Sequence, residues 1–179
     1  MTRWGCSLIG SRPRLSTPMS QHEHEVLSPR LLHIGFQRAR DRYMAEGRLA
    51  TDPAEALLPI IEALNWATTL DERLAADKGT PPSLDWPWRD KHEQGRVMRG
   101  VRFVRNRVHH QWATALYLDL RGAELPMPLP APLFEWRWRS RLPPGRDNHG
   151  EDDYRDHLAE RPARRTLDAL SELFLEAVP

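Results

Sequence analysis

Two arginines, an asparagine and two histidines stand close together in one short run, and these residue types suit phosphodiester chemistry. The run reads Arg105-Asn106-Arg107-Val108-His109-His110. An imidazole, with an unperturbed pKa of about 6.5, exchanges protons near neutral pH. A guanidinium stays charged, and its planar fork matches phosphate oxygens. Cleaving RNA without a metal needs a base for the 2′-hydroxyl, an acid for the leaving 5′-oxygen and a cation for the phosphate, and this run contains all three functions.

A helix is the element expected to hold these side chains. Apolar residues recur around the run at spacings of three and four: Val97, Val101, Val104, Val108, Trp112 and Ala115. At about 100° per residue they form one stripe with Arg105 on its rim, and four further polar side chains lie within about 140° of Arg105: Arg102, Asn106, His109 and His110. We therefore expect a helix from about residue 90 to 120, weakened at Gly95 and Gly100.

The order Arg105-Asn106-x-x-x-His110 resembles a known signature. It matches the RNxxxH form of the R-x(4–6)-H motif of HEPN domains, and the hexapeptide is similar to the catalytic segment of KEN nuclease domains, which are HEPN relatives. The resemblance covers this helix and, loosely, the helical layout, with no counterpart in the C-terminal third. It implies that His110 is the acid/base, Arg105 the phosphate clamp and Asn106 its positioning partner. His109, nearer the apolar stripe, is a second candidate for proton transfer.

The resemblance also implies how one helix could surround a phosphate. HEPN domains commonly form homodimers in which two motifs face one cleft, so RNA and a second copy of this chain are the expected partners. Two copies of Arg102, Arg105 and Arg107 would then converge, with Arg102 and Arg107 binding the substrate. The function expected from this arrangement is a metal-independent endoribonuclease that needs no cofactor and cleaves single-stranded RNA by 2′-hydroxyl attack. Such an enzyme would suit a toxin or an anti-phage defence effector, with an antitoxin or regulatory protein as a further partner.

Two other functions compete with this one. The same cluster could satisfy polar groups at a helix–helix contact, in a catalytically inactive HEPN-like module that binds RNA or protein. Exposure decides between them, because a nuclease needs Arg105 and His110 accessible beside a groove. A metal-dependent hydrolase is disfavoured because the eight histidines lack a fixed-spacing ligand set such as H-E-x-x-H.

Composition limits the remaining classes. The chain has 179 residues and a net charge of +1, so any binding of nucleic acid depends on a local patch. The single cysteine, Cys6, excludes an internal disulfide and a cysteine metal site. No apolar run has the length of a membrane span, and Met1 to Ile9 is too short and polar for a signal peptide, so we expect a cytoplasmic protein.

The expected fold is mainly α: an antiparallel, HEPN-like helical bundle over residues 27–179, after a disordered tail over 1–26. Ser28 with Pro29 and Asp52 with Pro53 are typical helix starts, and Gly47 and Gly79 are the matching stops.

The second helix carries polar positions that could orient Arg105 or a histidine, although the sequence does not choose among them: Glu62, Asn65, Asp71 and Glu72.

The C-terminal third differs in character. Residues 124–150 are rich in proline, which favours a loop or strap. Within it, alternation at period two around Trp136 and Trp138 predicts an extended segment. Its tryptophans either pack on the bundle, which is favoured, or stack on bases. A last helix is expected over 163–178.

Overall fold

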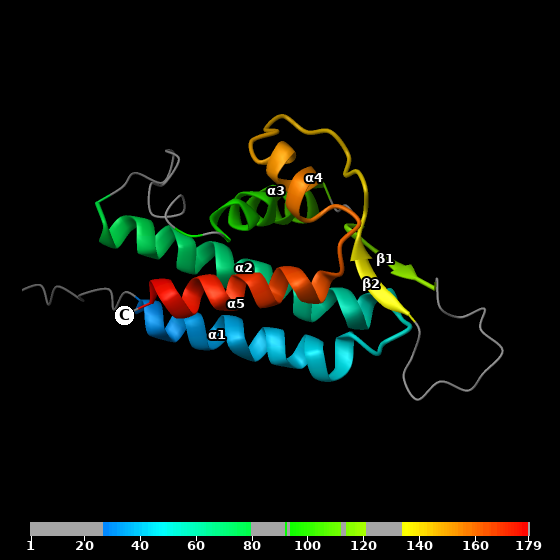
Figure 1. Ribbon diagram of the computed structural model, residues 1–179, viewed down its shortest axis with the longest axis horizontal. Helices are drawn as coiled ribbons and strands as arrows, with labels where there is room; N and C mark the ends of the chain where they lie inside the picture. The colour runs from blue at the N-terminus through cyan, green and yellow to red at the C-terminus, as the bar shows by residue number, and fades with distance from the viewer. Residues whose placement is uncertain (1–26, 80–91, 93, 112–113, 121–133, 179) are drawn as a thin grey trace, which may run out of the picture.

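The computed structural model describes residues 27–79, 92, 94–111, 114–120 and 134–178, and this part of the chain is mainly helical (Figure 1). Its helices are α1 (Pro29–Arg42), α2 (Pro53–Asp77), α3 (Gly95–Gln111), α4 (Glu151–His157) and α5 (Ala163–Ala177). A π-helical turn, η1 (Tyr43–Gly47), continues α1, and the strands β1 (Leu116–Asp119) and β2 (Glu135–Trp138) form a small sheet. The expected tail over 1–26, Trp112 and residues 124–133 of the proline-rich segment lie outside the described residues.

Helices α1 and α2 form an antiparallel pair whose ends follow local sequence signals (Figure 1). The Ser28 hydroxyl accepts a hydrogen bond from the Leu31 amide at 3.3 Å, and Oδ1 of Asp52 accepts from the Ala54 amide at 2.7 Å. Each bond satisfies an amide that the first turn of a helix leaves unpaired. Gly79 follows α2 with φ +68°, a left-handed conformation that glycine adopts readily. Both predicted helix starts and the stop at Gly79 are confirmed.

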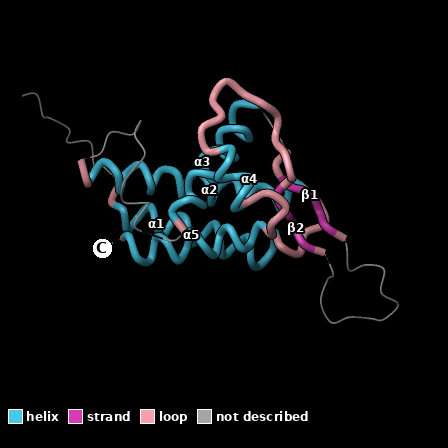
Figure 2. The backbone as a smooth tube through the Cα atoms, turned by 45° about the horizontal axis from the view of Figure 1, so that its top comes forward, coloured by secondary structure: helices cyan, strands magenta, loops and turns pink. Residues whose placement is uncertain are grey.

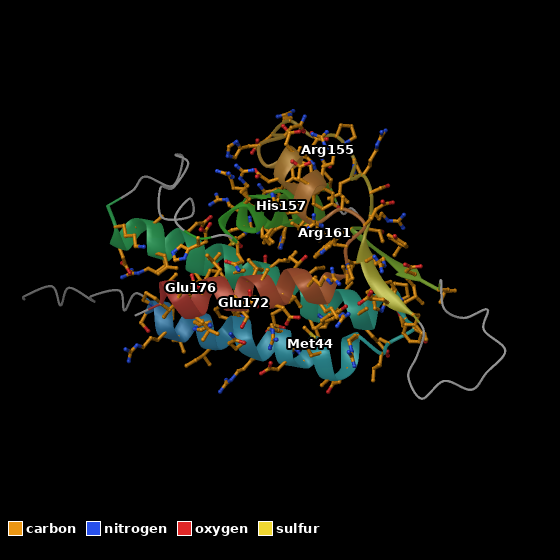
Figure 3. The ribbon with its side chains drawn as sticks, in the orientation of Figure 1. Met44, Arg155, His157, Arg161, Glu172 and Glu176 are labelled. Atoms are coloured by element: carbon orange, nitrogen blue, oxygen red, sulfur yellow. The ribbon has the colours of Figure 1, made fainter. Side chains whose placement is uncertain are left out.

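Helix α5 closes the apolar core against α1 and α3. Phe174 packs edge-on to Phe36 of α1, with ring centroids 5.3 Å apart, and Leu167 and Leu170 are fully buried. On the outer side of α5, Glu172 and Glu176 lie one turn apart (Figure 3). They accept hydrogen bonds from residues just before α3: Glu172 from Gln94 at 3.2 Å, and Glu176 from His92 at 2.8 Å. The predicted last helix is confirmed, and it anchors the start of α3.

Helix α3 is shorter than the periodicity predicted. It ends at Gln111, and residues 116–119, expected to continue the helix to Leu120, form strand β1 instead. β1 pairs antiparallel with β2, which places Leu116 opposite Trp138 and Leu118 opposite Trp136. This pairing buries two large aromatic side chains, and such tertiary packing outweighs a weak local helical preference.

The sheet lies at one end of the helices and ties the C-terminal third to them (Figure 2). Trp136 and Trp138 are 2 % and 0 % exposed. Their indole N–H groups donate to the Ala50 carbonyl at 3.0 Å and to the Thr166 hydroxyl at 2.8 Å. The predicted extended segment packed on the bundle is therefore confirmed. Because both rings are buried, neither offers a face for stacking on a base.

Candidate functional site

Arg105 and His109 lie one turn apart on α3, on the side that faces α2. Asn65 of α2 reaches between them. Nε of Arg105 donates to Oδ1 of Asn65 at 3.4 Å, and Nε2 of His109 lies 2.8 Å from the same oxygen. Nη1 of Arg105 also donates to Oδ1 of Asn106 at 3.2 Å. One amide oxygen on a neighbouring helix thus links the cation and one imidazole of the motif.

The hydrogen-bond partners fix the proton on His109. A guanidinium only donates, so the Asn65 atom that faces Arg105 must be the oxygen. An amide oxygen only accepts, so Nε2 of His109 must donate to it. Neutral His109 therefore carries its proton on Nε2 and has a lone pair on Nδ1. A lone pair held in one orientation is what a general base requires.

The surroundings of His109 also favour its neutral form. Partial burial lowers the pKa of His109 below 6.5, and the positive charge of Arg105 and the neighbouring His110 lower that pKa further. The same guanidinium that would hold a phosphate thus keeps the imidazole able to accept a proton near neutral pH.

His110 is exposed on α3, rotated about 100° from His109. It makes no side-chain hydrogen bond within the described residues, whereas His109 is bonded to α2. The structure therefore brings together Arg105, Asn106 and His109, with His110 beside the bonded group rather than within it. Arg105 is only partly buried, and its bonds go to amide oxygens rather than to carboxylates.

Arg102 lies one turn before Asn106 and is engaged by acids of α2. Its guanidinium lies 3.5 Å from the buried carboxylate of Asp71 and 3.6 Å from that of Glu72. The side chain of Arg102 is 29 % exposed and that of Asp71 is 0 % exposed. Removing Arg102 would take a compensating positive charge away from the buried carboxylate of Asp71. The expected substrate contact of Arg102 would thus have to coexist with this internal ion pair.

Arg107, the other expected substrate-binding arginine, points to the opposite side of α3 and is only 4 % exposed. Its guanidinium stacks on Phe103, 4.5 Å from the ring centroid. Nη2 donates to the Asp147 carbonyl at 2.8 Å and also to Oδ1 of Asn148. This geometry holds the loop before α4 onto α3 and leaves little of the guanidinium for a phosphate.

The structure selects Asn65 from the polar positions of α2 that sequence left open. Asp71 and Glu72 turn to Arg102, and Glu62 pairs with Arg42 of α1. In the sequence, Asn65 stands out as a polar residue on an apolar helix. Its polarity alone does not predict which side chain it bonds. Beyond that, no three His, Cys, Asp or Glu side chains among the described residues come together in a way that could hold a metal ion.

The chain matches no protein-family model, no curated protein and no solved structure. Among the described helices, none is both long and apolar enough to cross a membrane.

Proposed function

We propose that this protein is a metal-independent endoribonuclease that cleaves single-stranded RNA, with Arg105, Asn106, His109 and His110 as its reacting group. The observation that carries the proposal is the pair of hydrogen bonds to Oδ1 of Asn65. These bonds hold the guanidinium of Arg105 and the imidazole of His109 on one partly exposed face, with Nδ1 of His109 left to accept a proton. The resemblance of the motif to HEPN nucleases supports the same chemistry.

In this reaction Nδ1 of His109 takes the proton of the 2′-hydroxyl, and the 2′-oxygen attacks the adjacent phosphorus. The bond from phosphorus to the 5′-oxygen breaks, and His110 gives that oxygen a proton. The products are a 2′,3′-cyclic phosphate and a 5′-hydroxyl. Arg105 stabilises the charge that builds up on the phosphate oxygens, and Asn106 orients Arg105. His110 remains the candidate acid, while the hydrogen bond to Asn65 favours His109 as the base.

A homodimer completes the site in this proposal. The α3 helix of one chain contacts only one side of a phosphate, and α3 of a second copy would contact the opposite side. Arg105→Ala and His110→Ala protomers, each much slower than wild type alone, should regain part of the activity when mixed if one active site takes Arg105 from one chain and His110 from the other. Mixed samples that stay inactive, although heterodimers form, would place the whole site in one chain.

The proposal is tested by the ends of the product and by the role of metal. Wild-type protein should cleave single-stranded RNA in EDTA and leave 2′,3′-cyclic phosphate, and His109→Ala and His110→Ala should each slow cleavage by about 100-fold. Equal rates for wild type and both variants, or cleavage only after a divalent metal is added, would overturn it.

A second function is favoured by a different observation. Arg102 and Arg107 are both engaged within the chain, so two of the three expected RNA-contacting arginines serve the fold. In a catalytically inactive helical module that binds RNA or protein, most of these arginines would likewise be bonded within the chain. Protein that binds single-stranded RNA but never shortens it, even at high enzyme concentration, would identify the module.

A further inference from the structure

Next to Asn65 the surface is hollowed, on the side of α2 that faces the end of α1. The hollow has a volume of about 770 Å³. Its lining includes Arg42, Glu46, Glu55, Leu58, Glu62 and Asn65. Its volume lies within the range typical of small-molecule sites, roughly 300–1,000 Å³. Asn65 thus belongs both to this hollow and to the contact with Arg105 and His109.

The floor of the hollow is closely packed. A Cβ atom at Gly47 would lie 2.9 Å from Cδ2 of Tyr43 and 3.1 Å from Cγ of Pro59, so only glycine allows this approach. Tyr43 and Pro59 are themselves buried. The hollow is therefore formed by packed core residues before any ligand arrives.

The lining combines an apolar wall with acceptors of hydrogen bonds. Leu58 is 67 % exposed, and the partly buried Ile61 extends this apolar surface. Near this apolar surface lie the carboxylates of Glu46, Glu55 and Glu62, and Arg42 is the one cation among the described lining residues. Three carboxylates against one guanidinium repel a phosphate. They suit instead a flat, uncharged group with N–H donors on its edge.

We propose that this hollow binds the base of a nucleotide adjacent to the cleaved phosphate, and that the base is guanine. The inference rests on the proposed ribonuclease function. Proteins read single-stranded RNA by splaying bases out, stacking them on arginine or apolar surfaces and bonding their Watson–Crick edges. Guanine alone presents two adjacent donors there, N1–H and the N2 amino group, which one carboxylate can accept together. Uracil offers one N–H between two carbonyl oxygens, which carboxylates disfavour.

The geometry of α2 places the hollow within reach of the reacting group. Glu62 precedes Asn65 by almost one turn, and Leu58 precedes it by two, or about 10 Å at 1.5 Å per residue. Arg42 is paired with Glu62, which holds its planar guanidinium at the hollow. A chain with its phosphate at Arg105 could therefore place a neighbouring base between Arg42 and the apolar wall.

Nucleoside binding tests this assignment without requiring cleavage. Labelled protein is titrated by NMR with guanosine and with uridine, neither of which carries a phosphate. Guanosine should shift signals of the hollow-lining residues and bind at least about tenfold more tightly than uridine. The double variant Glu46→Gln/Glu55→Gln should lose this preference. Glu151→Gln, which removes an exposed carboxylate on α4, should keep it.

Each other outcome has a definite meaning. Equal affinity for the two nucleosides, no shift with either, or an unchanged preference in the double variant would overturn the assignment. So would tighter binding of arginine amide than of guanosine, because it would identify a protein partner's side chain as the occupant. Guanosine binding at the hollow without any RNA cleavage would keep the base site and overturn the ribonuclease. RNA cleavage that shows no base preference, in a protein that binds neither nucleoside, would keep the ribonuclease and overturn the base site.

Discussion

Arg105 and Arg107 are two residues apart on α3, yet they lie in two regions with different surroundings. About 200° of helical rotation separates them. Arg105 faces α2, is partly exposed and donates to the amide oxygens of Asn65 and Asn106. Arg107 faces the loop before α4, is 4 % exposed and donates to Asp147 and Asn148 while it stacks on Phe103. Residue type and motif position alone do not separate the arginine that we propose binds phosphate from the arginine that holds a loop onto α3; their partners and exposure do.

The largest stability effect should come from Arg107→Ala. Truncation removes a charged donor from two hydrogen bonds and a ring contact, and it leaves the Asp147 carbonyl without its partner. We expect a loss of about 3 kcal/mol in the free energy of unfolding. In thermal melts the midpoint should fall by roughly 10 °C. Arg105→Ala is the matched control and should lose less than about 1 kcal/mol. Equal losses in the two variants would remove the distinction between the regions.

Gly145→Ala should have the next largest effect, because it acts through Arg107. A Cβ atom at Gly145 would overlap the guanidinium of Arg107 and the side-chain amide of Gln111. Moving a buried guanidinium should cost about 2 kcal/mol of stability by denaturant titration. In the Arg107→Ala background the same substitution should cost much less, since the obstructing group is gone. Additive losses in the double variant would show that Gly145 acts through some other contact.

Asn65→Ala tests the other region, the side of α3 that faces α2. It should leave the melting midpoint almost unchanged, but slow cleavage by roughly 10- to 100-fold through lost positioning of Arg105 and His109. The ¹⁵N shifts of His109 provide a readout that a merely structural role would not change. Neutral His109 should be protonated on Nε2 in the wild type and become a mixture of tautomers in the variant. A wild-type ring protonated on Nδ1 would refute the orientation by Asn65.

The smallest effect concerns the titration of His109. Its pKa should lie below 6.5 in the folded protein, and Arg105→Ala should raise it, because a neighbouring positive charge is removed. Since the folded pKa is depressed, the unfolded chain binds the proton more readily. The stability from neutral His109 is therefore complete above pH 6.5 and declines as the pH falls from there through the folded pKa. NMR titration measures both values; a pKa unchanged in the variant would deny coupling between the two residues.

Sequence predicted the parts of this fold that depend on nearby residues. The starts of α1 and α2 follow from Ser28 and Asp52, whose partners lie three and two residues away, respectively. The end of α3 did not follow, because β1 forms only where β2, some twenty residues later, supplies Trp136 and Trp138 as partners. Mainly helical content was thus predictable, and the small sheet at its end was not.

The candidate site likewise has a part that the sequence predicted and a part that it did not. The motif and its place on a helix could be read locally, and Arg105 with His109 one turn later follows from helical spacing. Asn65 joins them from 40 and 44 residues upstream, and Arg107 is held from 40 residues downstream. No local pattern specifies which of two neighbouring arginines meets which distant partner, so the separation of their roles needed the tertiary structure.

The most direct measurement is the single-turnover rate of cleavage of a single-stranded RNA in EDTA by wild type, Arg105→Ala and Arg165→Ala. Arg165 is an exposed arginine on α5, so its variant removes the same charge away from the site. We expect wild type and Arg165→Ala to cleave at the same rate, and Arg105→Ala to be slower by about 100- to 1,000-fold. Equal rates in all three proteins, or no cleavage by any of them without added metal, would contradict the assignment of the α2-facing side of α3 to RNA cleavage.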